Sequence, residues 1–135
     1  MRPDSGYPAT AQATAIIVDD DVDLLAALTF SLELDGLRVM AHRSSETVTL
    51  ETLPADNACL VLDYRLPSAN GLELLERLRA GGVMLPAILI TSNASASVRE
   101  SVRAAGATLI EKPLLGDTLV KAIHAVMSGR NDPGQ

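Results

Sequence analysis

The stretch IIVDDD, residues 16–21, runs three apolar residues directly into three adjacent carboxylates. Short apolar runs without polar alternation are typical of strands that are buried on both faces of a parallel sheet. The acids then stand where such a strand ends, and they either cap a following helix or hold something positive. This stretch therefore predicts a buried strand with a charged site at its carboxyl end.

Four further apolar segments follow along the chain, and segments with helical spacing separate them. The five apolar segments are Ala15–Val18, Arg38–Ala41, Cys59–Leu62, Ala87–Ile90 and Thr108–Ile110. Apolar stripes over 22–32, 72–78, 98–105 and 119–127 predict helices, and the glycines just beyond them, the expected left-handed helix stops, are Gly36, Gly81, Gly106 and Gly129. A further helix is expected near Ser45–Leu53, where three threonines make the prediction weakest.

Alternation of strand and helix, repeated five times, predicts an α/β domain with a parallel sheet. Right-handed crossovers and short loops favour a doubly wound, five-stranded sheet in the order 2-1-3-4-5, which is a flavodoxin-like three-layer sandwich. A length of 135 residues fits one domain with a core that needs no disulfide. We expect the domain to span 14–129, with a flexible tail at 1–13 and a tail or the start of a linker at 130–135.

Composition argues against several classes of protein. The net charge is −6 and no basic cluster occurs, so direct binding of nucleic acid by these residues is not expected. No apolar run approaches the ~20 residues of a membrane span, and the first residues lack the apolar core of a signal peptide. We therefore expect a cytoplasmic protein with no membrane partner. The single cysteine, Cys59, stands in an apolar run and is expected in the core.

Polar residues follow four of the predicted strands, at the edge where sites form in open α/β sheets. They are Asp19, Asp20 and Asp21 after the first strand, Asp63 after the third, Thr91 and Ser92 after the fourth, and Glu111, Lys112 and Pro113 after the fifth. The simplest role of Asp21 is to cap the next helix. That role does not explain Asp63, so we expect a functional site on this rim.

Electrostatics indicates what such a rim could hold. Two carboxylates ~4 Å apart repel by roughly 4 kcal/mol at an effective dielectric constant of 20. Asp19, Asp20 and Asp63 would repel in this way unless a cation lay between them, and oxygen ligands favour Mg²⁺. Lys112 adds a fixed positive charge. A metal ion, a lysine and a hydroxyl describe a site of phosphoryl chemistry in which one carboxylate attacks phosphorus.

Four motifs together resemble the receiver domain of two-component response regulators over about residues 14–128. They are VDDD at 18–21, LDYRLP at 62–67, ITS at 90–92 and EKP at 111–113. The resemblance implies that Asp63 accepts a phosphoryl group from a sensor histidine kinase or a histidine phosphotransfer protein. It implies that Thr91 is a hydroxyl switch and that Lys112 pairs with a phosphoryl oxygen.

The resemblance also implies a metal site and a set of modulating positions. Mg²⁺ would be bound by Asp20, Asp63 and the main-chain carbonyl of Arg65, with Asp19 assisting through a water molecule. The Lys112–Pro113 peptide bond would be cis. Positions expected to modulate the site are Tyr64, Arg65, Asn93 and Leu109. Leu109 stands where the family carries its switch aromatic, three residues before the lysine, so the usual threonine–aromatic coupling is not expected here.

The implied function is a phosphorylation-driven signalling switch that catalyses only its own phosphorylation and slow autodephosphorylation. Its partners would be the phosphodonor and either a downstream protein target or an output domain of its own. The motifs DYRLP and EKPL favour the receiver of a longer transcription regulator, and the resemblance allows a phosphorylation-linked homodimer.

Two alternatives remain at this point. A haloacid-dehalogenase-like phosphatase would use Asp19 as the nucleophile and Asp21 as the acid, with TSN at 91–93 and Lys112 as partners. It needs a further acidic pair well downstream of the lysine, for which Asp117 is the candidate, and it leaves Asp63 without a role. The second alternative is a pseudo-receiver that binds partners without being phosphorylated, which the leucine at position 109 favours.

Overall fold

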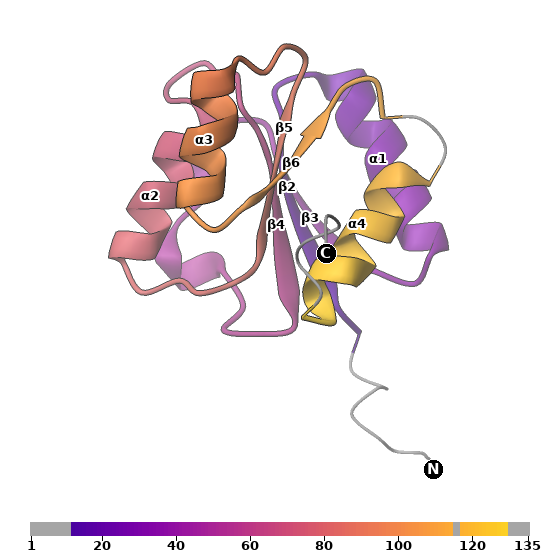
Figure 1. Ribbon diagram of the computed structural model, residues 1–135. Helices are drawn as coiled ribbons and strands as arrows, with labels where there is room; N and C mark the ends of the chain where they lie inside the picture. Colours follow the sequence, from indigo (N-terminus) through magenta and orange to yellow (C-terminus); the bar gives the residue numbers. More distant parts are fainter. Residues whose placement is uncertain (1–11, 115–116, 130–135) are drawn as a thin grey trace.

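A five-stranded parallel sheet lies between two layers of helices in the computed structural model, which describes residues 12–114 and 117–129 (Figure 1). The strands are β2 (Thr14–Val18), β3 (Arg38–His42), β4 (Ala58–Asp63), β5 (Ala87–Thr91) and β6 (Thr108–Glu111). Their order across the sheet is β3-β2-β4-β5-β6, and all four pairings are parallel. The predicted fold class and the strand order 2-1-3-4-5 are therefore confirmed. The predicted tails lie almost entirely outside the described residues.

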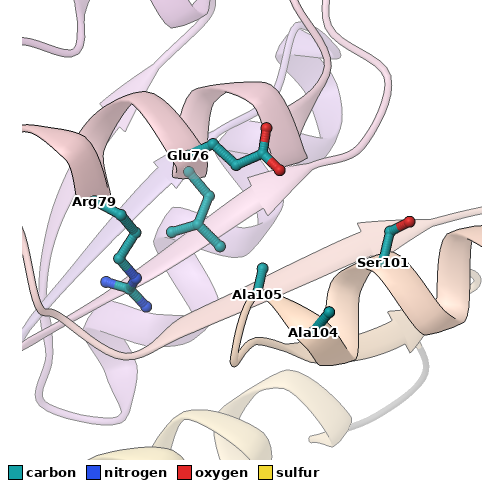
Figure 2. Close-up of a pocket in the computed structure, with 6 residues that line it drawn as sticks. Glu76, Arg79, Ser101, Ala104 and Ala105 are labelled. Carbon is teal, nitrogen blue, oxygen red and sulfur yellow. The ribbon is translucent and has the colours of Figure 1, made fainter.

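Two helices cover each face of the sheet. The helices are α1 (Val22–Leu34), α2 (Gly71–Ala80), α3 (Ala96–Ala104) and α4 (Thr118–Met127). Figure 1 shows α1 and α4 on one side of the strands and α2 and α3 on the other. Between α2 and α3 lies a groove of about 430 Å³ (Figure 2), whose lining residues are Leu75, Glu76, Arg79, Ser101, Ala104 and Ala105. None of the predicted site residues lines this groove.

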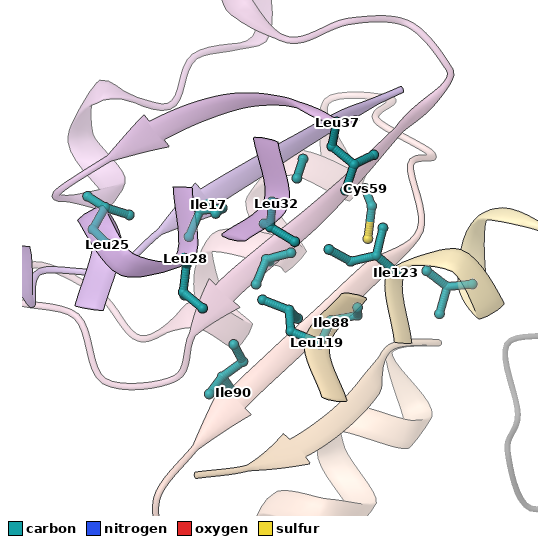
Figure 3. Packing of buried hydrophobic residues seen from close by; sticks show 13 residues of the cluster. Ile17, Leu25, Leu28, Leu32, Leu37, Cys59, Ile88, Ile90, Leu119 and Ile123 are labelled. Atoms are coloured by element: carbon teal, nitrogen blue, oxygen red, sulfur yellow. The ribbon is translucent and has the colours of Figure 1, made fainter. Parts of the chain in front are cut away.

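Each face of the sheet has its own apolar core, because successive strand residues point in opposite directions. Ile17 packs with Leu25 of α1 and Ile123 of α4 in one cluster (Figure 3). Its neighbour Ile16 packs with Leu75 of α2 in the other. Every residue of β2, β4 and β5 is buried, which explains why these strands read as continuous apolar runs. The rim thus stands at the carboxyl ends of three fully buried strands.

The helix predicted near Ser45–Leu53 is wrong. Two short 3₁₀ turns stand there instead, η2 (Ser45–Thr47) and η3 (Leu50–Thr52). Hydroxyl groups compete for the backbone in this segment, since Ser44 Oγ accepts from Glu46 N and Thr52 Oγ1 donates to Thr49 O. Such local bonds offer the chain an alternative to the helical ladder. The segment still covers the sheet, because Val48 is fully buried.

Helix ends follow the predicted signals with one difference. Asp21 is the N-cap of α1, as predicted, and its carboxylate accepts a hydrogen bond from Leu24 N at 3.1 Å. Gly81 ends α2 at a φ of −87°, so the left-handed residue is the next one, Gly82, at 96°. Cys59 is buried in the core as expected. Across the described residues no helix combines the length and the apolar character needed to cross a bilayer.

Candidate functional site

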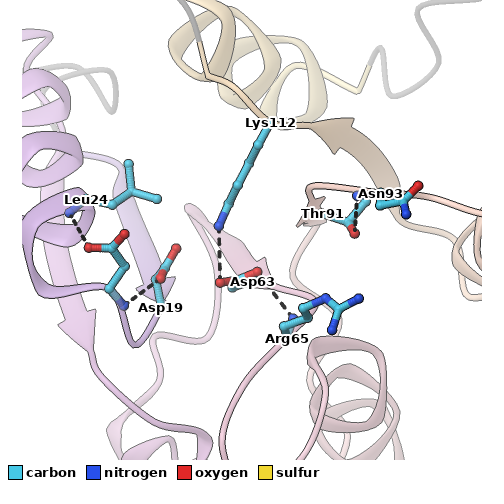
Figure 4. Close-up of polar contacts among 8 residues, drawn as sticks. Asp19, Leu24, Asp63, Arg65, Thr91, Asn93 and Lys112 are labelled. Carbon is cyan, nitrogen blue, oxygen red and sulfur yellow. Dashed lines mark hydrogen bonds and ion pairs between the residues drawn. The ribbon is translucent and has the colours of Figure 1, made fainter.

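The predicted site residues meet on one rim of the sheet, because the strands are parallel and the central ones adjoin (Figure 4). Asp19 follows β2 directly, Asp63 is the last residue of β4 and Thr91 is the last residue of β5. Lys112 follows β6 and reaches back toward Asp63. Residues separated by more than 90 positions in the sequence are thus brought together by the strand order alone.

Three carboxylates form the centre of the rim. Asp19, Asp20 and Asp63 each offer an oxygen, and these three oxygens lie within 4.8 Å of one another. Asp19 is 2% exposed and Asp63 is 6% exposed, whereas Asp20 is exposed to solvent. Because buried charges require nearby compensation, such a group of acids is unfavourable unless something positive approaches it.

Backbone amides orient two of these acids. Asp21 N donates to Asp19 Oδ1 at 2.9 Å, and Arg65 N donates to Asp63 Oδ1 at 3.3 Å. The pKa of Asp19 is raised from 3.8 to about 6, chiefly by burial and also by the charges of Asp63 and Asp20. The amide of Asp21 and the ammonium of Lys112 oppose this rise in pKa. The electrostatics of the rim therefore favours the binding of a proton or a cation by these acids.

Lys112 supplies the fixed positive charge. Its Nζ lies 3.4 Å from Asp63 Oδ2, and its backbone N donates to Thr91 O at 2.8 Å. The latter bond ties the loop after β6 to the end of β5. The peptide bond between Lys112 and Pro113 is cis. The ammonium group thus stands beside the carboxylate that sequence analysis assigns as the phosphoryl acceptor.

Thr91 and the modulating positions lie around this centre. Thr91 is buried, and its Oγ1 accepts a hydrogen bond from Asn93 N at 3.3 Å. Arg65 and Asn93 are exposed, whereas Tyr64 is half-buried against the α2 side of the core. Leu109 is also half-buried on that side, in β6 beside β5. A leucine side chain thus stands at the position of β6 where an aromatic ring was expected from the family.

Sequence reasoning missed a polar link beside the site. Glu111 Oε2 accepts a hydrogen bond from Ala94 N at 3.3 Å and forms an ion pair with Arg99 at 2.9 Å. These contacts join the end of β6 to the loop that follows Thr91 and to α3. The place of Glu111 directly before Lys112 in the EKP motif indicated that it lies near the site, but its partners could not be predicted from the sequence.

The donor set fits a divalent cation that prefers oxygen. Three carboxylates whose oxygens lie within 4.8 Å of one another match the all-oxygen coordination of Mg²⁺, which also keeps several water ligands. Asp20 is exposed, so water can reach the site from solvent. Cys59 is buried in the core and does not belong to this group of carboxylates.

Comparison with known proteins identifies the family. Residues 15–124 match the response regulator receiver domain. The chain belongs to this family. Among relatives of this receiver domain is the transcriptional regulatory protein FixJ of Azorhizobium caulinodans, 31% identical over 120 residues, which are 88% of this chain and 57% of FixJ. Another is the C4-dicarboxylate transport transcriptional regulatory protein DctD of Pseudomonas aeruginosa, 31% identical over 91% of this chain and 27% of DctD.

Solved structures agree with this assignment. The crystal structure of FixJ-N superposes with a TM-score of 0.77 at 31% identity, covering 87% of this chain and 94% of that one. A CheY-like receiver domain protein from Methanospirillum hungatei superposes with a TM-score of 0.80 at 25% identity, covering 89% and 97%. This receiver domain spans little more than half the length of FixJ. The comparisons do not favour the phosphatase alternative, in which Asp19 would be the nucleophile.

Proposed function

We propose that this receiver domain accepts a phosphoryl group on Asp63 from a phosphorylated histidine of a sensor kinase or phosphotransfer protein. One observation carries the proposal: the nearly buried Asp63 carboxylate lies between two other acids and the Lys112 ammonium group, 3.4 Å away. A cation-binding acidic group beside a lysine is the arrangement that phosphoryl transfer requires. The family match supports the same assignment.

The reaction forms one bond and breaks one. An oxygen of the Asp63 carboxylate attacks phosphorus in line with the donor's imidazole nitrogen, and the phosphorus–nitrogen bond breaks. The imidazole nitrogen keeps the electron pair and takes up a proton, while Asp63 becomes an acyl phosphate. Lys112 stabilises the charge on a phosphoryl oxygen, because its ammonium group already lies beside the acceptor.

Asp19, Asp20, Asp63 and the main-chain carbonyl of Arg65 would hold Mg²⁺. The bound ion supplies positive charge that neutralises the acids and the phosphoryl oxygens. The amides of Asp21 and Arg65 keep the carboxylates of Asp19 and Asp63 oriented toward the same point. Thus the protein's contribution is to fix the ligands before the donor arrives.

The response to phosphorylation would begin at Thr91. Its hydroxyl can turn toward the new phosphate and release the hydrogen bond from Asn93 N, which reorders the loop between β5 and α3. Leu109 cannot follow this movement as an aromatic ring would. Arg65, Asn93 and Tyr64 would tune the rate at which water removes the phosphoryl group. The receiver is thus a switch that catalyses only its own phosphorylation and slow dephosphorylation.

The outer surface of α1 supports contact with a protein partner. Val22, Phe30 and Leu34 are 50%, 68% and 74% exposed, and together with Ala26 they form one apolar row at a spacing of four residues. Phe30 is the only phenylalanine of the chain. The row begins beside the acidic rim, so a phosphodonor that covers it would bring its histidine near Asp63.

The output is proposed to be transcriptional regulation in the cytoplasm, through an output domain or a separate protein target, with or without phosphorylation-linked dimerisation. FixJ and DctD, which are named as transcriptional regulatory proteins, support this proposal. The charge of −6 argues against direct contact between these residues and nucleic acid.

Intact-mass analysis after incubation with acetyl phosphate tests the proposal. The wild-type chain should gain the mass of one phosphoryl group when Mg²⁺ is present, and the Asp63→Asn variant should gain none. An Asp56→Asn variant is the matched control, because Asp56 is exposed in the loop that enters β4, at the opposite end of that strand from Asp63. No gain by the wild-type chain would favour the pseudo-receiver, and labelling of Asp63→Asn would favour another nucleophile.

A further inference from the structure

The first residue of α2 touches the main chain of the phosphoryl acceptor. Gly71 is buried, and a Cβ atom built on it would lie much closer than 3.0 Å to the Asp63 carbonyl oxygen. The same atom would lie 2.8 Å from Leu89 Cδ1 and 3.1 Å from the Asp63 carbonyl carbon. Real Cβ atoms essentially never approach other atoms within 3.0 Å. Only glycine fits here without movement of Asp63, α2 or both.

Backbone conformation does not explain this glycine. Among the residues that the structure describes, the glycines with positive φ are Gly36, Gly82, Gly106 and Gly129, and Gly71 is not one of them. Alanine is the better helix former at a position with helical φ, so local propensity disfavours the glycine. Close approach of α2 to the strand end is therefore the physical reason for it.

Further contacts fix the same stretch of chain. Gly71 N donates to Tyr64 O at 2.8 Å, which closes the loop between β4 and α2. Tyr64 N in turn donates to Ile90 O at 2.7 Å, so the residue after the acceptor is tied to β5. The capping box between Asn70 and Glu73 fixes the start of α2 at this point. Asp63 is thus held between its own strand and the first turn of α2.

We infer that Gly71 is a positioning residue for phosphoryl acceptance: its missing side chain lets α2 pack directly on the Asp63 carbonyl and so sets where the Asp63 carboxylate stands. The inference rests on the proposed function. An alanine would displace the acceptor or the helix by about half an ångström or more. A displacement on this scale changes the distance from Asp63 to Lys112 and to the other acids, on which the transfer depends.

The test compares two alanine variants at opposite ends of α2. Gly71→Ala places its Cβ against the backbone of Asp63, whereas Gly81→Ala places it 2.8 Å from the side chain of Leu50, which can move. Both glycines have φ in the range that alanine adopts. The measurements are the maximal rate of Mg²⁺-dependent phosphorylation by acetyl phosphate, the Mg²⁺ affinity and the thermal unfolding midpoint. Rates are measured well below the unfolding midpoint of each variant.

Gly71→Ala should lower the maximal rate by about tenfold to a hundredfold while the chain remains folded. Gly81→Ala should stay within about threefold of wild type, even if both variants lose similar thermal stability. Equal rates for the two variants would overturn the inference. If the wild-type chain itself takes up no phosphoryl group, the proposed function fails. If the wild-type chain is labelled but the two variants react at equal rates, only the inference about Gly71 fails, so the two failures are distinguishable.

A second variant separates positioning from simple crowding of the core. Leu89→Val in the Gly71→Ala background removes Leu89 Cδ1 but leaves the contact with the Asp63 carbonyl. The double variant should regain stability yet remain slow, and recovery of the wild-type rate would contradict a positioning role. If neither variant folds, amide NMR of the wild-type chain decides. Phosphorylation should then shift the Gly71 amide more than the Gly81 amide, and an unmoved Gly71 signal would refute the inference.

Discussion

Replacing Asp19 by asparagine measures how much the charge of this acid lowers the free energy of unfolding in the absence of metal. The substitution keeps an oxygen that can accept the hydrogen bond from Asp21 N, which is 2.9 Å long, and removes only the charge. Burial and the neighbouring acids raise the pKa of Asp19 from 3.8 to about 6. A pKa difference of this size between the unfolded and folded chain corresponds to about 3 kcal/mol.

The sign of the pH dependence follows from the direction of this change in pKa. Because the folded-state pKa of Asp19 lies above its unfolded value, the folded chain binds more protons between about pH 4 and pH 6. The contribution of Asp19 to stability therefore falls as the pH rises through this window. Its penalty is complete above about pH 6 and absent below about pH 4.

Urea unfolding in the presence of EDTA provides the assay. At neutral pH the Asp19→Asn variant should be more stable than wild type by about 2–3 kcal/mol, and at about pH 4 the difference should disappear. Asp56→Asn is the control, since an exposed acid should change the unfolding free energy by less than about 0.5 kcal/mol. A gain below about 0.5 kcal/mol at neutral pH, or an equal gain at both pH values, would refute the electrostatic reasoning.

Three further outcomes are expected. Lys112→Met should slow phosphorylation by acetyl phosphate at least about tenfold, because the ammonium group 3.4 Å from Asp63 is lost; an unchanged rate by intact mass would show that the lysine is not used. Asp21→Ala should cost about 1 kcal/mol in urea unfolding, because Leu24 N loses its cap, while Asp21→Asn should cost only a few tenths. Cys59, whose pKa burial raises to about 12, should resist iodoacetamide at mildly alkaline pH until the chain is unfolded, and rapid labelling of the native chain would contradict its burial.

The rim could be predicted from the sequence because, in a parallel sheet, the residue that ends each strand lies at the same edge of the sheet. Once β2, β4 and β5 were recognised as buried strands, their carboxyl ends had to share one edge. Asp19, Asp63 and Thr91 then needed no knowledge of side-chain packing to be placed together. The same argument could not supply the length of the contact between Lys112 and Asp63, since that depends on the loop after β6.

The features that the sequence analysis predicted wrongly or missed have physical reasons as well. At Ser45–Leu53 a helix was expected, but hydroxyl side chains bond to the local backbone there and two 3₁₀ turns form instead. Two contacts were also missed. The hydrogen bond from Ala94 N to Glu111 joins segments that are far apart in the sequence. Gly71 and Asp63 meet through main-chain atoms. Neither periodicity nor composition carries that information.

The pKa of Asp19 also constrains how metal and protons act on this receiver domain. A penalty of about 3 kcal/mol is a large part of the 5–15 kcal/mol by which a domain of this kind is stable. A cation that binds between Asp19, Asp20 and Asp63 in the folded chain relieves this penalty and stabilises the fold by mass action. Protons relieve it too, so the two must compete. Stabilisation by Mg²⁺ should therefore be largest above about pH 6 and should fade as Asp19 becomes protonated below it. If added Mg²⁺ raised the unfolding midpoint equally at about pH 4 and at neutral pH, the ion would be bound elsewhere than at these acids.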